Sequence, residues 1–202
     1  MWISWKHQTS DFRGPLTYEQ KVEIFYEQTL GWQLHIADLI ANGGTTFPQI
    51  DTSQPGYEVP SIRHSGFAVL HICMSYFELV GSLVSSETGS RKRFNAGVKE
   101  VLPEVLPGTA DDDTLLSLLY EGARCGLYHS ARPGAPVGLG QPDDGNAIAY
   151  DRGRGKAVIN PHRLPRVFKA HLLELRTKLM DPVSVDLRQR FQERFDTGFP
   201  SR

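Results

Sequence analysis

Residues 61–86, SIRHSGFAVLHICMSYFELVGSLVSS, are the stretch that decides the fold. Apolar side chains occupy nearly the whole circumference of a helix drawn through it: Val69, Leu70, Ile72, Met74, Phe77, Leu79, Val80 and Leu83. The polar side chains fall on one line at spacings of four and three, namely His71, Ser75, Glu78, Ser82 and Ser85. Such spacing keeps residues on a single helix face. The stretch therefore predicts a central buried helix with one polar seam.

The segments around this helix carry further helical signals. Thr17 and Gln20 form a capping box that starts a helix, and Asn42-Gly43-Gly44 ends it. Residues 43–60 are rich in Gly, Pro, Thr and Ser and predict a loop. Later helices are predicted over 90–103, over 111 to about 130, after Asn160-Pro161 and after Asp181-Pro182. Their apolar faces include Leu164, Phe168, Leu172, Leu175 and Leu179, and then Leu187, Phe191 and Phe195.

Together these signals predict an all-α fold, a bundle of five to six helices with one small β-hairpin before the penultimate helix. The hairpin is expected at about residues 146–160, where two short apolar runs flank a glycine-containing turn. Residues 1–15 are polar and contain Gly14-Pro15, which predicts a flexible N-terminal arm. Residues 16–202 are expected to form a single domain.

Composition narrows the classes of function. The 202 residues are 40% hydrophobic and carry a formal net charge of −1, which excludes a whole-protein basic field for non-specific DNA binding. Cys73 and Cys125 suggest neither a disulfide framework nor a zinc site, so no metal or cofactor is expected. No signal peptide is evident, and no apolar run approaches the ~20 residues that span a bilayer. We therefore expect a soluble, cytoplasmic protein without membrane contact.

The chemistry is expected in residues 119–134, LYEGARCGLYHSARPG. A glycine inside an exposed helix lowers helix stability by roughly 1 kcal/mol relative to alanine. The presence of Gly122 and Gly126 in a predicted helix therefore calls for an explanation. Small side chains let another backbone or a ligand come close to the helix. Arg124 suits a phosphate, which it can bind through two parallel hydrogen bonds, and His129 can exchange a proton near neutral pH.

Together, Arg124 and His129 suit cleavage of RNA without a metal, because the histidine assists attack by a 2′-hydroxyl and the arginine neutralises the developing charge. Five residues separate them, about 140° around an ideal helix. They converge only if the helix loosens after Gly126 or if two copies meet across a two-fold axis. In the simpler alternative, Arg124 pairs with Glu121 and His129 only ends the helix.

The R-x4-H spacing of Arg124 and His129 resembles the signature of the HEPN superfamily (higher eukaryotes and prokaryotes nucleotide-binding). The segments MSYFELVGSL, YEGARCGLYHSA, VINPHRL and FQERFD are similar, in that order, to bacterial HEPN-like proteins of a plasmid- and defence-associated group. The resemblance covers about residues 60–196. It implies a helical, metal-independent endoribonuclease or toxin-like effector that acts as a homodimer, with RNA or a nucleotide as ligand and an antitoxin as a further partner. On that pattern Arg124 binds the phosphate and His129 transfers the proton.

Two positions depart from the superfamily pattern. Active members usually carry a polar residue after the arginine, where this chain has Cys125, and toxins controlled by a nucleotidyltransferase carry a tyrosine where it has Ala131. The alternative is therefore a non-catalytic HEPN-type module that binds RNA or a nucleotide, or that uses its small-residue face for a protein partner. Two residues are expected to support the site: Glu78 by orienting Arg124, and Tyr128 by stacking on a base or lying in an interface.

Three further groups of charged residues could take part in binding, but each also has a simpler structural explanation. Asp111, Asp112 and Asp113 stand at a helix start, where capping is expected rather than metal binding. The groups Arg91-Lys92-Arg93 and Arg152/Arg154/Lys156 contact phosphates in one interpretation and form solvated surface in the other.

Overall fold

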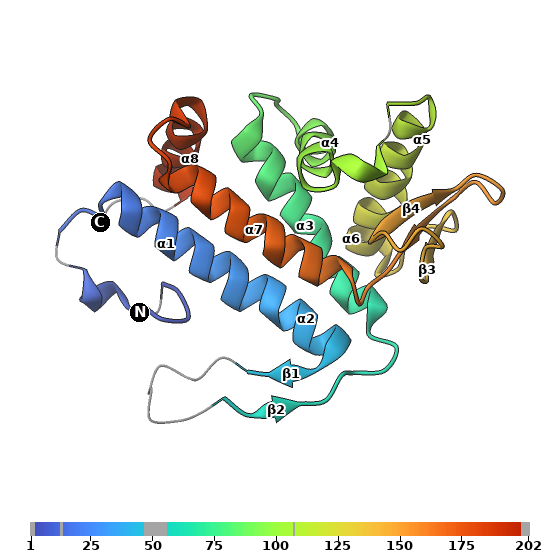
Figure 1. Cartoon of the computed structure of the whole chain (residues 1–202), viewed down its shortest axis with the longest axis horizontal. Coiled ribbons are helices and arrows are strands. Elements are labelled where there is room, and N and C mark those ends of the chain that lie inside the picture. Colours follow the sequence, from blue (N-terminus) through green and yellow to red (C-terminus); the bar gives the residue numbers. More distant parts are fainter. Residues whose placement is uncertain (1–2, 13, 47–55, 107, 199–202) are drawn as a thin grey trace.

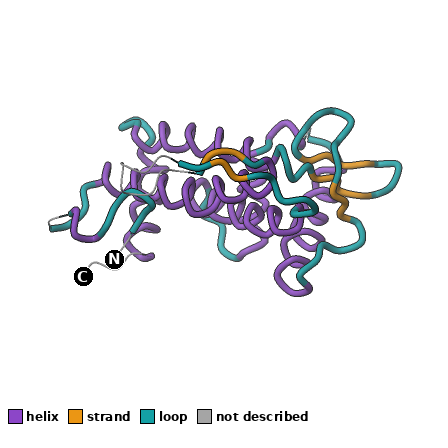
Figure 2. Tube along the Cα trace, turned by 90° about the horizontal axis from the view of Figure 1, so that it is seen from below, coloured by secondary structure: helices purple, strands orange, loops and turns teal. Residues whose placement is uncertain are grey.

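A computed structural model of the chain describes residues 3–12, 14–46, 56–106 and 108–198. It is mostly helical, with two small sheets (Figures 1 and 2). The α-helices are α1 (Tyr18–Thr29), α2 (His35–Asn42), α3 (Gly66–Val84), α4 (Ser90–Val101), α5 (Asp111–Ser117), α6 (Gly126–Ser130), α7 (Leu164–Met180) and α8 (Val185–Gly198). Two π-helical segments, η2 (Leu30–Leu34) and η4 (Leu118–Cys125), join α1 to α2 and α5 to α6, and short 3-10 turns lie at η1 (Thr9–Asp11) and η3 (Pro103–Val105).

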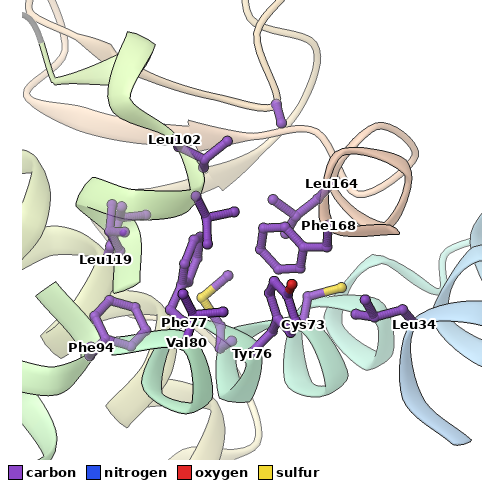
Figure 3. Packing of buried hydrophobic residues seen from close by; sticks show 14 of the residues in the cluster. Leu34, Cys73, Tyr76, Phe77, Val80, Phe94, Leu102, Leu119, Leu164 and Phe168 are labelled. Atoms are coloured by element: carbon purple, nitrogen blue, oxygen red, sulfur yellow. The ribbon is translucent and has the colours of Figure 1, made fainter. Parts of the chain in front are cut away.

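The central buried helix is α3, as the sequence predicts. Figure 1 shows α3 in the middle of the molecule, with α1, α2 and α7 on one side of it and α4, α5 and α6 on the other. Tyr76 and Phe77 of α3 meet Phe94 of α4 and Phe168 of α7 in one aromatic core (Figure 3). The seam remains at the surface, and the serines along it donate hydrogen bonds to carbonyls of their own helix.

Helix α3 is long and apolar enough to cross a membrane by length and composition alone, so the expectation that no segment reaches this limit is wrong. Half of its most apolar window is buried inside the fold. A central core helix passes the same test as a membrane span, so this single helix is weak evidence for one.

Helix boundaries follow local chemistry only in part. The capping box is present, because Thr17 Oγ1 accepts from the Gln20 N–H at 3.2 Å and Gln20 Oε1 accepts from the Thr17 N–H at 2.8 Å. Asn160 does not begin α7 directly. Its side chain accepts from the N–H groups of residues 162 and 163 in a preceding turn, and the helix starts at Leu164. The apolar faces expected for the last two helices are buried or packed against the core.

The predicted hairpin is one part of a three-stranded sheet. Strands β4 (Ile148–Asp151) and β5 (Lys156–Ile159) pair antiparallel, and β3 (Val137–Leu139) adds in parallel to β5, giving the order β3-β5-β4. Figure 2 shows this sheet at one end of the helical body. A second small sheet, β1 (Gly44–Thr45) with β2 (Glu58–Val59), lies within the predicted loop of residues 43–60, of which 47–55 lie outside the described residues.

Residues 3–12, within the segment where the sequence predicts a flexible arm, pack against the helices. Ser4 is fully buried and donates to the Glu27 carboxylate at 2.6 Å. The Trp5 ring lies against the backbone of Gly31, in a space that any larger residue would fill. The polar composition of the segment did not reveal this contact, because Ser4 and Glu27 are 23 residues apart and no local pattern connects them.

Candidate functional site

Residues 111–130 form one continuous helix whose middle is wider than an α-helix. The Gly126 N–H donates to the Glu121 and Ala123 carbonyls, not to Gly122 as an α-helix requires. The Gly122 carbonyl accepts instead from the Gly134 N–H at 2.8 Å. The returning chain thus takes one acceptor out of the helical ladder, and the turn widens into the π-helical segment η4.

The two glycines admit the chain's own backbone. A Cβ on Gly122 would lie 2.7 Å from Cγ2 of Val137, and one on Gly126 would lie 2.9 Å from the Arg132 carbonyl oxygen. Both distances are too short for a real carbon contact. The small-residue face is therefore covered by residues 132–137 of the same chain. The expectation that another backbone comes close to this face is therefore confirmed, and the backbone belongs to the same chain.

Arg124 pairs with Glu78, as the polar seam of α3 predicts. Arg124 Nη2 donates to Glu78 Oε2 at 3.1 Å, and the two side chains are 22% and 27% exposed. Partial burial lowers the pKa of Arg124, but the Glu78 carboxylate outweighs this and raises the pKa above its ordinary value. The guanidinium is therefore a fixed positive charge at the surface, already balanced by one carboxylate.

Aromatic rings flank this guanidinium. Residues Tyr120, Arg124 and Tyr128 follow one another at intervals of four on the same helix, and Arg124 Cζ lies 5.7 Å from the Tyr120 ring and 4.7 Å from the Tyr128 ring. His71 of α3 stacks on Tyr128 with ring centroids 4.6 Å apart. Arg91 of α4 lies over Tyr120 at 5.7 Å. We call these five residues the Arg124 strip.

His129 does not join the strip. Its side chain is exposed, and it makes no hydrogen bond or ion pair with any described residue. It lies in α6, which is regular α-helix, while the widened turn precedes Gly126. The helix therefore does not loosen after Gly126, and no recorded contact joins Arg124 and His129 within one chain.

The simpler alternative is also only half right. Glu121 does not pair with Arg124, because Arg91 Nη1 binds Glu121 Oε1 at 2.9 Å. His129 does stand in the last turn of α6, which ends at Ala131 in the left-handed conformation. The i,i+3 spacing within one helix predicted the wrong partner for Glu121, because Arg91 on α4 also lies within ion-pair distance of it.

The acidic start of α5 holds the turn before the helix and makes an ion pair. Ala110 occupies the N-cap position without a side-chain cap hydrogen bond, so the expected aspartate cap is not formed. Asp112 accepts from the N–H groups of Gly108 at 3.0 Å and Thr109 at 3.3 Å, and Asp111 pairs with Arg152. These aspartates, with Glu104, Asp144 and neighbouring residues, line a hollow of about 220 Å³. Its carboxylates would repel an RNA phosphate. No group of three metal-ligating side chains gathers anywhere in the described part of the chain.

Two members of the strip were missed in the sequence. Tyr120 stands four residues before Arg124, the interval that places it on the same helix face, so this spacing was a readable signal. His71 was placed on the polar seam, but its partner Tyr128 is 57 residues away in sequence and no local pattern connects them.

Comparisons with protein-family models, with curated proteins and with solved structures find no match to this chain.

Proposed function

We propose that this chain is an HEPN-like, metal-independent endoribonuclease or toxin-like effector that binds RNA at the Arg124 strip. The observation that carries the proposal is the Arg124 guanidinium, held by Glu78 at 3.1 Å and flanked by two tyrosines at the surface. A fixed guanidinium suits a phosphodiester, and neighbouring rings suit an unpaired base. The R-x4-H resemblance supplies the second group, His129.

The proposed reaction needs no metal. His129 takes the proton of a ribose 2′-hydroxyl, whose oxygen forms a new bond to the adjacent phosphorus while the bond from phosphorus to the 5′-oxygen breaks. Arg124 neutralises the charge that develops on the phosphoryl oxygens. The proton returns to the departing 5′-oxygen, so the products are a 2′,3′-cyclic phosphate end and a 5′-hydroxyl end.

His129 would complete the site from a second copy of the chain. It is exposed and makes no hydrogen bond or ion pair within the described residues, so it is open to contacts across a two-fold axis. A homodimer would then offer each Arg124 the histidine of its partner. An antitoxin that restrains the effector and a cytoplasmic location, where RNA is present, belong to the same proposal.

The second candidate is a non-catalytic module that binds RNA or a nucleotide. Cys125 beside Arg124 favours it, because this thiol stands where active superfamily members usually carry a polar residue. The ion pair with Glu78 favours it too, since a phosphate must compete with a carboxylate already in place.

An RNA digestion assay with a metal chelator present separates the two candidates. We expect the wild-type chain to cleave single-stranded RNA, and Arg124→Ala and His129→Ala each to reduce the rate at least about a hundredfold. This is the usual contribution of one electrostatic donor to the transition state, for Arg124, and of one acid–base group, for His129. Tyr128→Phe is the matched control, because it keeps the ring beside Arg124. Equal activity in all variants, or cleavage by none of them, would reject catalysis, and RNA binding without cleavage would support the module.

A further inference from the structure

The basic group Arg91-Lys92-Arg93 at the start of α4 separates into two kinds of side chain. Lys92 pairs with Glu87 at 3.1 Å, and Arg93 donates to the Glu87 carbonyl at 3.1 Å, so both interact with the loop before the helix. Arg91 extends the other way, to Glu121 and Ser117 on the helix that carries Arg124. Sequence alone did not distinguish these three cations from one another, and it left both phosphate contact and solvated surface open for all of them.

Arg91 and Arg124 share one ring. Each guanidinium carbon lies 5.7 Å from the centroid of Tyr120, so the ring holds both cations at the same surface. Tyr120 itself is half-buried and packs edge-on against Phe94 in the core, which fixes its position. Two guanidinium groups therefore contact one ring, whose position the core fixes.

The partners of the two arginines differ in exposure. Arg91 and Glu121 are 52% and 55% exposed, so their ion pair is screened by water and is readily exchanged for another anion. Arg124 and Glu78 are less than one-third exposed and make a more protected pair. An incoming strand would thus displace Glu121 from Arg91 more easily than Glu78 from Arg124.

We propose that Arg91 is a second phosphate-binding residue, which contacts the phosphate next to the one at Arg124 on the same single strand of RNA. This inference rests on the proposed function and adds a subsite to it. Two arginines that contact one aromatic ring offer two cationic contacts to a single strand, whose phosphates recur at each nucleotide. Glu121 then acts as a competitor that occupies Arg91 when no RNA is bound.

Binding is measured by fluorescence anisotropy with a labelled 2′-O-methyl RNA of about ten nucleotides, which lacks the attacking hydroxyl and is not cleaved. We expect Arg91→Ala to weaken binding several-fold and to reduce the slope of log affinity against log salt by about 0.7, the value for one phosphate contact on a single strand. Glu121→Gln is expected to strengthen binding. Lys92→Ala, which removes the same charge one residue away, is the matched control and should change little.

A dinucleoside monophosphate supplies the second arm, because its single phosphate contacts only one of the two arginines at a time. Arg91→Ala should weaken this ligand less than the longer strand, because Arg124 remains, whereas damage to the fold would weaken both ligands alike. The inference is overturned if Arg91→Ala behaves like Lys92→Ala while Arg124→Ala still weakens binding of the longer strand. If Arg124→Ala has no effect either, the proposed function fails, and the subsite fails with it. A DNA strand of the same sequence shows whether the subsite distinguishes the sugar.

Discussion

Glu78 decides how available Arg124 is. The Glu78 carboxylate lies on the polar seam of α3 and accepts a hydrogen bond from Arg124 Nη2 at 3.1 Å. This bond holds the guanidinium next to the rings of Tyr120 and Tyr128. The same contact neutralises the charge that an RNA phosphate would need. One residue therefore positions the proposed phosphate-binding group and competes with its ligand.

Replacing Glu78 by glutamine tests this competition. Glu78→Gln keeps a hydrogen-bond acceptor of the same shape but removes the negative charge, so we expect RNA to bind about two- to fivefold more tightly, which corresponds to a partly exposed ion pair of up to about 1 kcal/mol. Anisotropy with the non-cleavable strand measures it. Glu121→Gln serves as a comparison, and weaker binding by Glu78→Gln would mean that the charge of Glu78 is needed to position Arg124.

At the scale of elements, glycines set how closely helices approach. Gly81 of α3 and Gly97 of α4 face each other, and a Cβ on Gly97 would overlap the Phe77 carbonyl oxygen and lie 3.0 Å from the Gly81 nitrogen. The backbones of α3 and α4 are thus in direct contact. Neither glycine stood out in the sequence, because each lies in an ordinary helical pattern.

Alanine at position 97 should therefore be costly. The atoms that its methyl group would strike belong to backbone and cannot rotate away, so we expect Gly97→Ala to lower the free energy of unfolding by about 3 kcal/mol, at the upper end for overpacking. Denaturant unfolding measures the loss. Gly138→Ala is the matched control, since nothing lies within 4 Å of its Cβ position, and a similar loss in both variants would contradict the packing argument.

At the scale of the whole molecule, one buried polar pair sits inside the core. Tyr76 Oη and His171 Nδ1 lie 2.9 Å apart, between α3 and α7, and His171 is 8% exposed. Burial raises the pKa of the Tyr76 hydroxyl and lowers that of the His171 imidazole below its ordinary 6.5. The smaller effects on the His171 pKa are those of Glu100 and Glu174, which raise it, and of Lys178, which lowers it further. The core is therefore built around a neutral histidine.

This histidine predicts that acid weakens the fold. The unfolded chain takes up a proton on His171 near pH 6.5, whereas the folded chain does so only at lower pH. Stability should be complete above pH 6.5 and fall as the pH drops towards the lowered pKa of the folded state. Thermal unfolding between about pH 8 and pH 5 checks this, with His171→Gln as the comparison. An equal decline in that variant would assign the acid sensitivity to other groups.

The sequence by itself determined the helical class, the central helix α3, the capping box and the buried faces of the last two helices. Local periodicity is enough for these, because the apolar pattern of one helix marks which side is buried. It also indicated Glu78 as the partner of Arg124, because the charge stands on the polar line of an otherwise apolar helix.

Only the tertiary structure decided the rest. In the folded chain, residues 132–137 cover Gly122 and Gly126, and Arg91 rather than Arg124 pairs with Glu121. His71 stacks on Tyr128, and residues 3–12 pack against the helices. The fold also leaves His129 outside the contacts of Arg124. Each of these contacts joins separate segments of the chain, and periodicity shows which way a side chain faces but not which distant side chain it meets.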